Sequence, residues 1–413
     1  MSKKFPEGFL WGAATASHQI EGGLINNWVK WEEKNATRLS KDGQRPSNEA
    51  LKEVACDPEN YKSNSSYSCD SYKYWERDIE AIKKLNLKAY RLSVEWSRIQ
   101  PERGVFDSKE IEYYRKYLKA LRDNNIKIVL TCWHWTIPVW LDEEGGLLSK
   151  NIYKYFNEYV SFLAKELGEY VDYWIVINEP ESFAASYLLG MWPPGIKNPF
   201  LFHKVFKKVL PKMYIDSYKT IKDIDKGSKV SLAKNVWHVS SCSRAPWNRF
   251  VAFLFDRYMT VSIMDQVVKY TDFLGINFYF HNRLGIRGLR NDNDIISDLG
   301  WWLDPGKIFN VLVKIKERYN KPIFITENGL ATLDDNKRIW WIEETVKAMD
   351  KAIKEESVEL MGYLHWSLLD NFEWDKGFWP KFGLVSVDPQ TKERRIKRSG
   401  EFYSKIIKEN GII

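Results

Sequence analysis

Cysteine is scarce in this sequence, with only four in a chain of 413 residues. None of them forms a CxxC pair, and so few in a chain of this length do not make a disulfide framework. The six histidines are also not spaced like zinc ligands. We therefore expect reduced thiols and no bound metal.

Long hydrophobic runs and blocks of like charge are missing as well. No stretch of 18 apolar residues occurs, which argues against a transmembrane helix, and the first residues contain no apolar signal segment. The formal net charge is +7, but no five consecutive residues carry the same sign, which argues against a nucleic-acid groove. We expect a cytoplasmic protein with no membrane or nucleic-acid partner.

Several motifs of common enzyme classes are also absent. The sequence contains neither the GxSxG elbow of serine hydrolases nor the HExxH pattern of zinc proteases. The GxGxxG and P-loop patterns of nucleotide-binding proteins are missing too. We expect no cofactor.

Aromatic residues, by contrast, are abundant. They make up 15% of the chain and include 19 tryptophans. Such a composition is consistent with a large aromatic core, and also with a carbohydrate site in which flat rings pack against sugar C–H groups. Composition alone leaves both interpretations open.

Short apolar segments recur about every 40–50 residues, the spacing of β-strand and α-helix units. Helical patterns lie between them, as over 107–123 and over 149–168, where Gly168 stands in the C′ position. Residues 35–71 show no clear period, and we predict a long loop there. The pattern favours one (β/α)8 TIM barrel of the α/β class, a single domain over residues 1–413. The predicted strands are 9–12, 89–94, 127–131, 173–177, 229–233, 273–277, 322–326 and 360–366.

A glutamate follows two of these strands, Glu179 after 173–177 and Glu327 after 322–326, and each lies beside an asparagine. A carboxylate at the end of a buried strand is costly unless it is paired or hydrogen-bonded. Each glutamate alone could simply satisfy a nearby arginine or loop amide. Two at matched positions on the active face of a barrel favour glycoside cleavage, which needs a pair of carboxyl groups.

Four segments of the chain resemble motifs of glycoside hydrolase family 1, the β-glucosidase family. Residues 9–22 resemble the family's N-terminal signature, 178–180 its acid/base motif and 326–329 its nucleophile motif. Residues 365–374 resemble its sugar-binding segment on the eighth strand. The resemblance extends from residue 9 to about 389 and implies a retaining hydrolase.

The resemblance also implies roles for individual residues. Glu327 would be the nucleophile and Glu179 the general acid/base. Arg91 and Asn277 would support the site, with Arg91 open to a second interpretation as a barrel-interior ion-pair partner. The residues expected to bind the substrate are Gln19, His134, Asn178, Tyr279, Trp366, Glu373 and Trp374.

Several positions depart from the family pattern. The chain is shorter than usual, with the shortening expected between 237 and 271. Thr136 replaces a common Asp, Trp192 a common His, and Trp302 a common acidic residue. The tryptophans either favour a flat or apolar aglycone or only fill gaps left by shorter loops.

Four functions remain open at this point. The first is hydrolysis of β-glucosides, extending to β-fucosides and β-galactosides, and the second is transglycosylation through the same intermediate. The third is a phospho-β-glycosidase, whose phosphate-binding Ser, Lys and Tyr are replaced here by Glu373, Pro380 and Phe382. The fourth is a carbohydrate-binding protein without catalysis, disfavoured because both glutamates remain. In each case the expected partner is a small β-glycoside or oligosaccharide.

Overall fold

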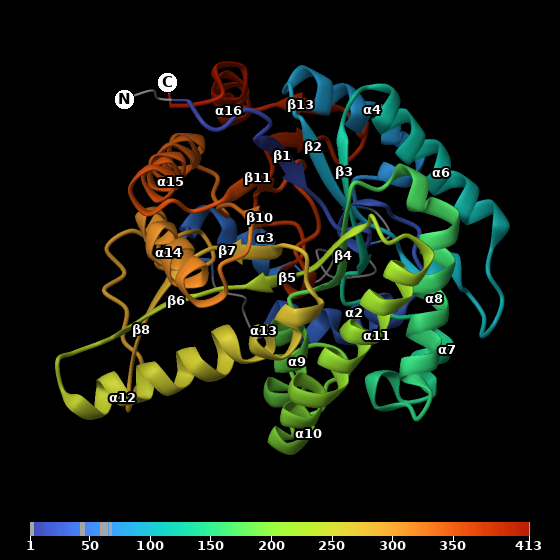
Figure 1. The fold of residues 1–413 in the computed structure, drawn as a ribbon, viewed down its shortest axis with the longest axis horizontal. Helices are drawn as coiled ribbons and strands as arrows, with labels where there is room; N and C mark the ends of the chain where they lie inside the picture. Colours follow the sequence, from blue (N-terminus) through green and yellow to red (C-terminus); the bar gives the residue numbers. More distant parts are fainter. Residues whose placement is uncertain (1–3, 42–45, 58–64, 66–67, 413) are drawn as a thin grey trace.

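The computed structural model describes residues 4–41, 46–57, 65 and 68–412. Eight parallel strands close into a barrel in the order β1-β11-β10-β7-β5-β4-β3-β2 (Figure 1). Each overlaps one of the eight predicted segments, which confirms the (β/α)8 barrel. The barrel strands are β1 (Leu10–Ala14), β2 (Ala89–Ser93), β3 (Lys127–Trp133), β4 (Tyr173–Asn178), β5 (Lys229–Asn235), β7 (Leu274–Phe278), β10 (Ile323–Asn328) and β11 (Leu360–Trp366).

Alternation along the strands decides which side chains point into the barrel. Ala89 on β2 and Val129 on β3 belong to the apolar cluster inside it. Arg91 lies two residues after Ala89 and therefore points the same way. Arg91 is fully buried, and a buried guanidinium requires an anionic or hydrogen-bonding partner. The partner of the Arg91 charge must therefore lie nearby.

Helices cover the outside of the barrel (Figure 1). The predicted helix 107–123 is α6 (Ser108–Asp123), and the Asp107 carboxylate caps its start by accepting the N–H of Lys109 at 2.8 Å. The other α-helices are α1 (Ser17–Ile20), α2 (Asn27–Lys41), α3 (Lys52–Cys56), α4 (Ser71–Lys84), α5 (Trp96–Ile99), α7 (Val139–Glu143), α8 (Ile152–Leu167), α9 (Pro180–Leu189), α10 (Pro199–Lys204), α11 (Leu210–Ile224), α12 (Pro246–Phe255), α13 (Ser262–Val267), α14 (Ile308–Tyr319), α15 (Asp335–Glu356) and α16 (Arg398–Glu409).

Two local predictions were wrong. The predicted loop over 35–71 contains the end of α2 and all of α3, although residues 42–45, 58–64 and 66–67 lie outside the described residues. The helix predicted over 149–168 is α8, and it ends at Leu167. Gly168, however, has a right-handed φ of −57° and begins a 3-10 turn. The backbone at Gly168 is therefore not in the left-handed conformation for which a glycine is favoured at the C′ position.

A small sheet and one helix extend from the barrel after β5. Strand β6 (His238–Ser241) pairs with β8 (His281–Gly285), which forms a hairpin with β9 (Gly288–Leu289). Helix α12 follows β6 and projects away from the barrel beside this sheet (Figure 1). A second small sheet joins β12 (Val385–Val387) to β13 (Arg394–Ile396).

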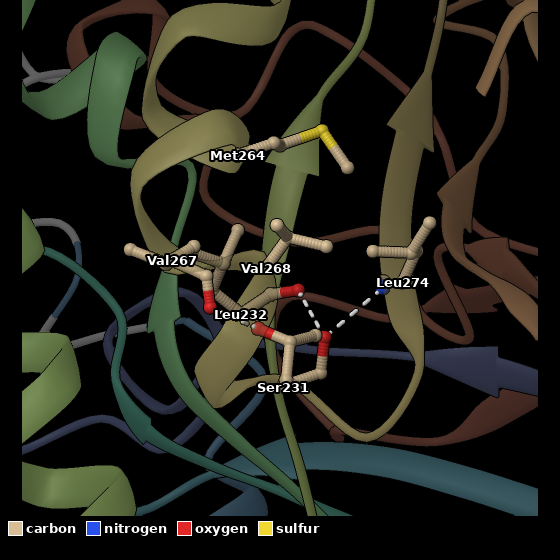
Figure 2. A pocket seen from close by; sticks show the side chains of 8 residues that line it. Ser231, Leu232, Met264, Val267, Val268 and Leu274 are labelled. Atoms are coloured by element: carbon tan, nitrogen blue, oxygen red, sulfur yellow. Dashed lines mark hydrogen bonds between the residues drawn. The ribbon is translucent and has the colours of Figure 1, made fainter. Parts of the chain in front are cut away.

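A void of about 10 Å³ lies outside the barrel between α13 and strands β5 and β7. Its lining is mostly apolar, and the Ser231 hydroxyl donates to the Leu232 carbonyl at 2.9 Å (Figure 2). The same hydroxyl donates to the Phe273 carbonyl at 2.7 Å. A space of this size holds about one water molecule. It is a packing defect rather than a binding site.

Candidate active site

The carboxyl ends of the barrel strands surround a cavity of about 390 Å³. Arg91 and Asn277 do not line this cavity but contact residues that do. All nine residues predicted to act in catalysis or to bind substrate line it: Gln19, His134, Asn178, Glu179, Tyr279, Glu327, Trp366, Glu373 and Trp374.

Glu327 lies near the end of β10, where the pairing with β7 slips out of register after Ile325. Such an irregularity redirects the side chains that follow it. Glu327 Oε1 accepts a hydrogen bond from Arg91 Nη1, and Oε2 accepts one from the Tyr279 hydroxyl at 2.6 Å. Burial raises the pKa of this carboxyl to about 7, while Arg91 and the Tyr279 hydrogen bond oppose the rise. Arg91 is thus the ion-pair partner of Glu327.

Gly329 follows two residues later and lies against β11. A Cβ atom at this position would overlap the Trp366 carbonyl oxygen. The close approach brings the Trp366 segment next to the end of β10. This explains physically why a glycine follows the Glu-Asn pair.

Glu179 directly follows β4, in a left-handed conformation with φ +41°. Its backbone N–H donates to the Ala233 carbonyl on β5 at 2.7 Å, which fixes this turn against the neighbouring strand. Its carboxyl group accepts from two neutral amides, Asn277 Nδ2 at 2.8 Å on Oε1 and Asn235 Nδ2 at 3.2 Å on Oε2. The two glutamates therefore differ: one faces a guanidinium, and the other faces amides only.

Asn178 connects the surroundings of the two carboxyl groups. Its Oδ1 accepts from Arg91 Nη2 at 2.7 Å and from Asn277 Nδ2 at 3.3 Å. Its Nδ2 lies 3.0 Å from His134 Nε2. Burial and the Arg91 charge hold the pKa of His134 well below its usual range, so the ring is neutral. Nε2 then accepts from Asn178, which leaves the ring proton on Nδ1.

Gln19 and Glu373 form a second polar group in the lining of the cavity. Gln19 Nε2 donates to the Glu373 carboxylate at 3.1 Å and to the Phe372 carbonyl at 2.8 Å. Among the described residues, Gln19 Oε1 and His134 Nδ1 are buried without a hydrogen-bond partner. Trp374 stacks on His18 at 5.0 Å between ring centroids. The cavity thus combines unpaired polar atoms with flat ring faces, as a sugar site requires.

The sequence matches the Glycosyl hydrolase family 1 profile over residues 1–273 and 255–412. The chain belongs to glycosyl hydrolase family 1. It is 32% identical to the 1,4-beta-D-glucan glucohydrolase of Thermotoga neapolitana and 31% identical to the human cytosolic beta-glucosidase, with 99% of both chains covered each time. The structure matches a Thermotoga maritima beta-glucosidase in complex with deoxynojirimycin with a TM-score of 0.89, 29% identity and full coverage of both chains.

The family resemblance seen in the sequence is therefore confirmed. The alignment with the Thermotoga neapolitana protein spans 461 positions, more than the 413 residues of this chain. This family 1 chain therefore lacks segments that its relative contains, in agreement with its predicted shortness.

Sequence reasoning missed three residues of this family 1 site. Asn235 lines the cavity and contacts Glu179. Glu181 and Lys234 form a fully buried ion pair at 3.0 Å, and Glu181 Oε1 also accepts the backbone N–H of Asn235 at 2.6 Å. The available signal was Lys234 itself, a cation among residues that are otherwise uncharged from Val230 to Asn235. The pair joins the start of α9 to the end of β5, beside Glu179.

The outer part of the cavity is largely apolar. Trp192 lines it, as the sequence analysis considered, but Trp302 does not and stacks on His281 at 4.3 Å instead. Thr136 is also buried elsewhere, with its hydroxyl on Glu95. The apolar residues of this outer part are Leu189, Trp192, Trp237, Phe280, Leu299 and Trp301.

Two kinds of feature are absent from the described part of the chain. There, no three His, Cys, Asp or Glu side chains lie together as metal ligands. Within the same residues, no helix is both long and apolar enough to span a membrane.

Proposed function

We propose that this family 1 enzyme is a retaining β-glycosidase that hydrolyses terminal β-D-glucosides. The observation that carries the proposal is the different surroundings of two buried carboxyl groups in one cavity. A guanidinium and a tyrosine hydroxyl favour the ionised form of Glu327, as a nucleophile requires. Neutral amides on Glu179 allow it to carry and release a proton.

The reaction then has two steps. Glu327 attacks the anomeric carbon while Glu179 protonates the departing oxygen, which gives a covalent glycosyl-enzyme and the free aglycone alcohol. Glu179 next removes a proton from water, which attacks the anomeric carbon and releases Glu327. A sugar or alcohol in place of water gives transglycosylation, which belongs to the same proposal.

The remaining cavity residues would hold the sugar. Gln19 Oε1 and the His134 Nδ1–H are free to meet hydroxyl groups, and Asn178 lies between the two carboxyl groups, where the 2-hydroxyl would come. Trp366 and Trp374 would pack against the ring. β-D-Galactosides differ from β-D-glucosides only at C4, and β-D-fucosides differ only at C4 and C6. Because these differences are small, we include both as substrates in the proposal.

The nucleophile is tested by trapping with a 2-deoxy-2-fluoro glucosyl fluoride. The label should be found on Glu327 in a peptide digest, and label on Glu179 would contradict the assignment. A crystal structure should place the two carboxyl groups about 5–5.5 Å apart, as in retaining enzymes. A separation of about 6.5–9.5 Å would indicate inversion instead.

The phospho-β-glycosidase alternative is tested through Glu373. Burial raises the pKa of this carboxyl to about 8, so repulsion of a 6-phosphate should grow as the pH rises through that value. We expect kcat/KM for an aryl β-glucoside to exceed that for its 6-phosphate at pH 7, and the ratio to widen at pH 9. A larger value for the phosphate would favour the alternative.

We further propose that residues 1–413 form one catalytic domain and that the enzyme is cytoplasmic. The closed barrel built from residues along the whole chain supports the first point. Three free cysteines, Cys69, Cys132 and Cys242, support the second, because free thiols are usual in reducing compartments. Protease treatment of the native enzyme and cell fractionation test these two points.

A further inference from the structure

Helix α12 has an apolar outward face. At 100° per residue, its four most exposed large apolar side chains fall within an arc of about 120°. The opposite side contains the buried Ala252 and the half-buried Val251 and Phe255. The exposed side chains are Trp247 (60%), Phe250 (60%), Phe253 (58%) and Leu254 (48%). A helix on the surface of a barrel normally shows polar residues on this side.

The tip of the β8–β9 hairpin extends this apolar surface. The backbone N–H of Ile286 donates to Asn248 Oδ1 at 3.0 Å, which holds the tip against the start of α12. Ile286 is 68% exposed and Leu289 59%. We call these six side chains, Trp247, Phe250, Phe253, Leu254, Ile286 and Leu289, the α12 patch.

Four exposed arginines accompany the α12 patch. Within the described residues, none of their guanidinium groups makes a hydrogen bond or ion pair with the protein. Of the nearby acidic residues, Asp256 at the end of α12 is paired with Lys314, and Asp292 is paired with Arg283, which leaves Asp294 as an exposed acid beside the hairpin. The region is therefore positively charged as well as apolar. The four arginines are Arg244, Arg249, Arg287 and Arg290.

We propose that the α12 patch binds the surface of a membrane with anionic phospholipids. Aromatic and aliphatic side chains on one helix face, with arginines beside them, are the features of an interfacial helix. Anionic headgroups would neutralise the arginines while the rings enter the acyl boundary. A second copy of the chain would fit this surface less well, because it would bring the same four arginines to the contact and the two sets of cations would repel each other. This proposal differs from the sequence-based expectation of no membrane partner. It requires no membrane-spanning segment, because α12 would lie on the membrane surface.

The test is co-sedimentation of the full chain with vesicles of equal parts phosphatidylglycerol and phosphatidylcholine. Binding should be strong at low salt, weaken as salt is added, and be far weaker on vesicles of phosphatidylcholine alone. The double variant Arg249→Gln/Arg287→Gln should lose about 25-fold in affinity, about fivefold for each arginine. Phe250→Ser/Phe253→Ser should lose about tenfold or more.

Leu333→Ser is the matched control, because Leu333 is an exposed apolar residue outside the patch, at 47%. It should bind the vesicles like the wild type. Turnover of a soluble aryl glucoside should be unchanged in all variants, which shows that they fold. Equal binding by the wild type and both double variants would overturn the proposal. The proposal would also be overturned if the wild type did not bind the vesicles but formed a dimer in analytical ultracentrifugation, and Phe250→Ser/Phe253→Ser abolished that dimer.

Discussion

Removal of the Tyr279 hydroxyl should make the enzyme's activity more sensitive to acid. In the wild type this hydroxyl donates to Glu327 Oε2 at 2.6 Å and lowers the pKa of the carboxyl. A hydrogen bond to a charged group contributes about 1.5–3 kcal/mol, which corresponds to about 1–2 pH units. Tyr279→Phe should therefore raise the Glu327 pKa from about 7 by that amount. The ionised fraction at pH 7 would fall about 5-fold to 50-fold.

The measurement is kcat/KM for 4-nitrophenyl β-glucoside between pH 5.5 and 9.5. The acidic limb of the wild-type profile should lie near pH 7, and that of Tyr279→Phe should lie higher. The two enzymes should differ less at the top of the range, where Glu327 is ionised in both. The direction follows because, in the proposed mechanism, only the ionised carboxylate attacks the sugar.

Tyr214→Phe is the control for this experiment. Tyr214 is also buried, but its hydroxyl donates to the Tyr270 carbonyl at 2.8 Å and has no contact with the cavity. Its profile should match that of the wild type. If Tyr279→Phe lost activity equally at every pH, with the acidic limb unmoved, the hydrogen bond would only orient Glu327 and the argument from its pKa would be wrong.

Three further predictions concern the neighbouring carboxyl groups. Glu179→Ala should slow glucosides with poor leaving groups far more than activated aryl glucosides, with partial rescue by azide; equal losses in the glycosylation step would exclude Glu179 as the acid. The folded-state pKa of Glu373, about 8, exceeds its ordinary 4.5, so its contribution to stability is present below pH 4.5 and is lost as the pH rises through 8. Glu373→Gln should therefore melt a few degrees above the wild type at pH 9 and no higher at pH 5 by calorimetry. Glu181→Gln should destabilise the fold by about 3 kcal/mol in urea unfolding, because Lys234 stays buried without its anion, and Glu181→Gln/Lys234→Met should recover much of that loss.

The barrel was predictable because its strands are buried on both faces. Segments such as 173–177 and 322–326 are nearly all apolar, and their spacing indicates the connecting helices. The same logic predicted where the site lies, since polar residues directly after such strands lie at one end of the barrel. Glu179 and Glu327 were proposed in this way, and both line one cavity in the structure.

Contacts that depend on local irregularities were not predictable. The ion pair of Glu181 with Lys234 forms because Glu179 turns the chain into α9 in a left-handed conformation, which the sequence does not reveal. Helix α2 was missed because its end, from Asn35, is rich in polar residues and packs only a few apolar side chains, among them Ala36 and Leu39. Trp301 and Trp302 are adjacent in sequence, and only the fold shows that Trp301 faces the cavity.

The indole rings around the cavity also give the protein an optical property. Trp28, Trp135, Trp366 and Trp374 line the cavity, and Trp374 lies 4.6 Å from Trp28 and 4.8 Å from Trp135 between ring centroids. A bound sugar would replace solvent at these rings and change their fluorescence emission. Occupancy of the cavity could then be followed in a variant without turnover, such as Glu327→Gln, with no chromogenic group attached to the ligand. Natural glycosides that release no dye could be ranked by affinity in the same way.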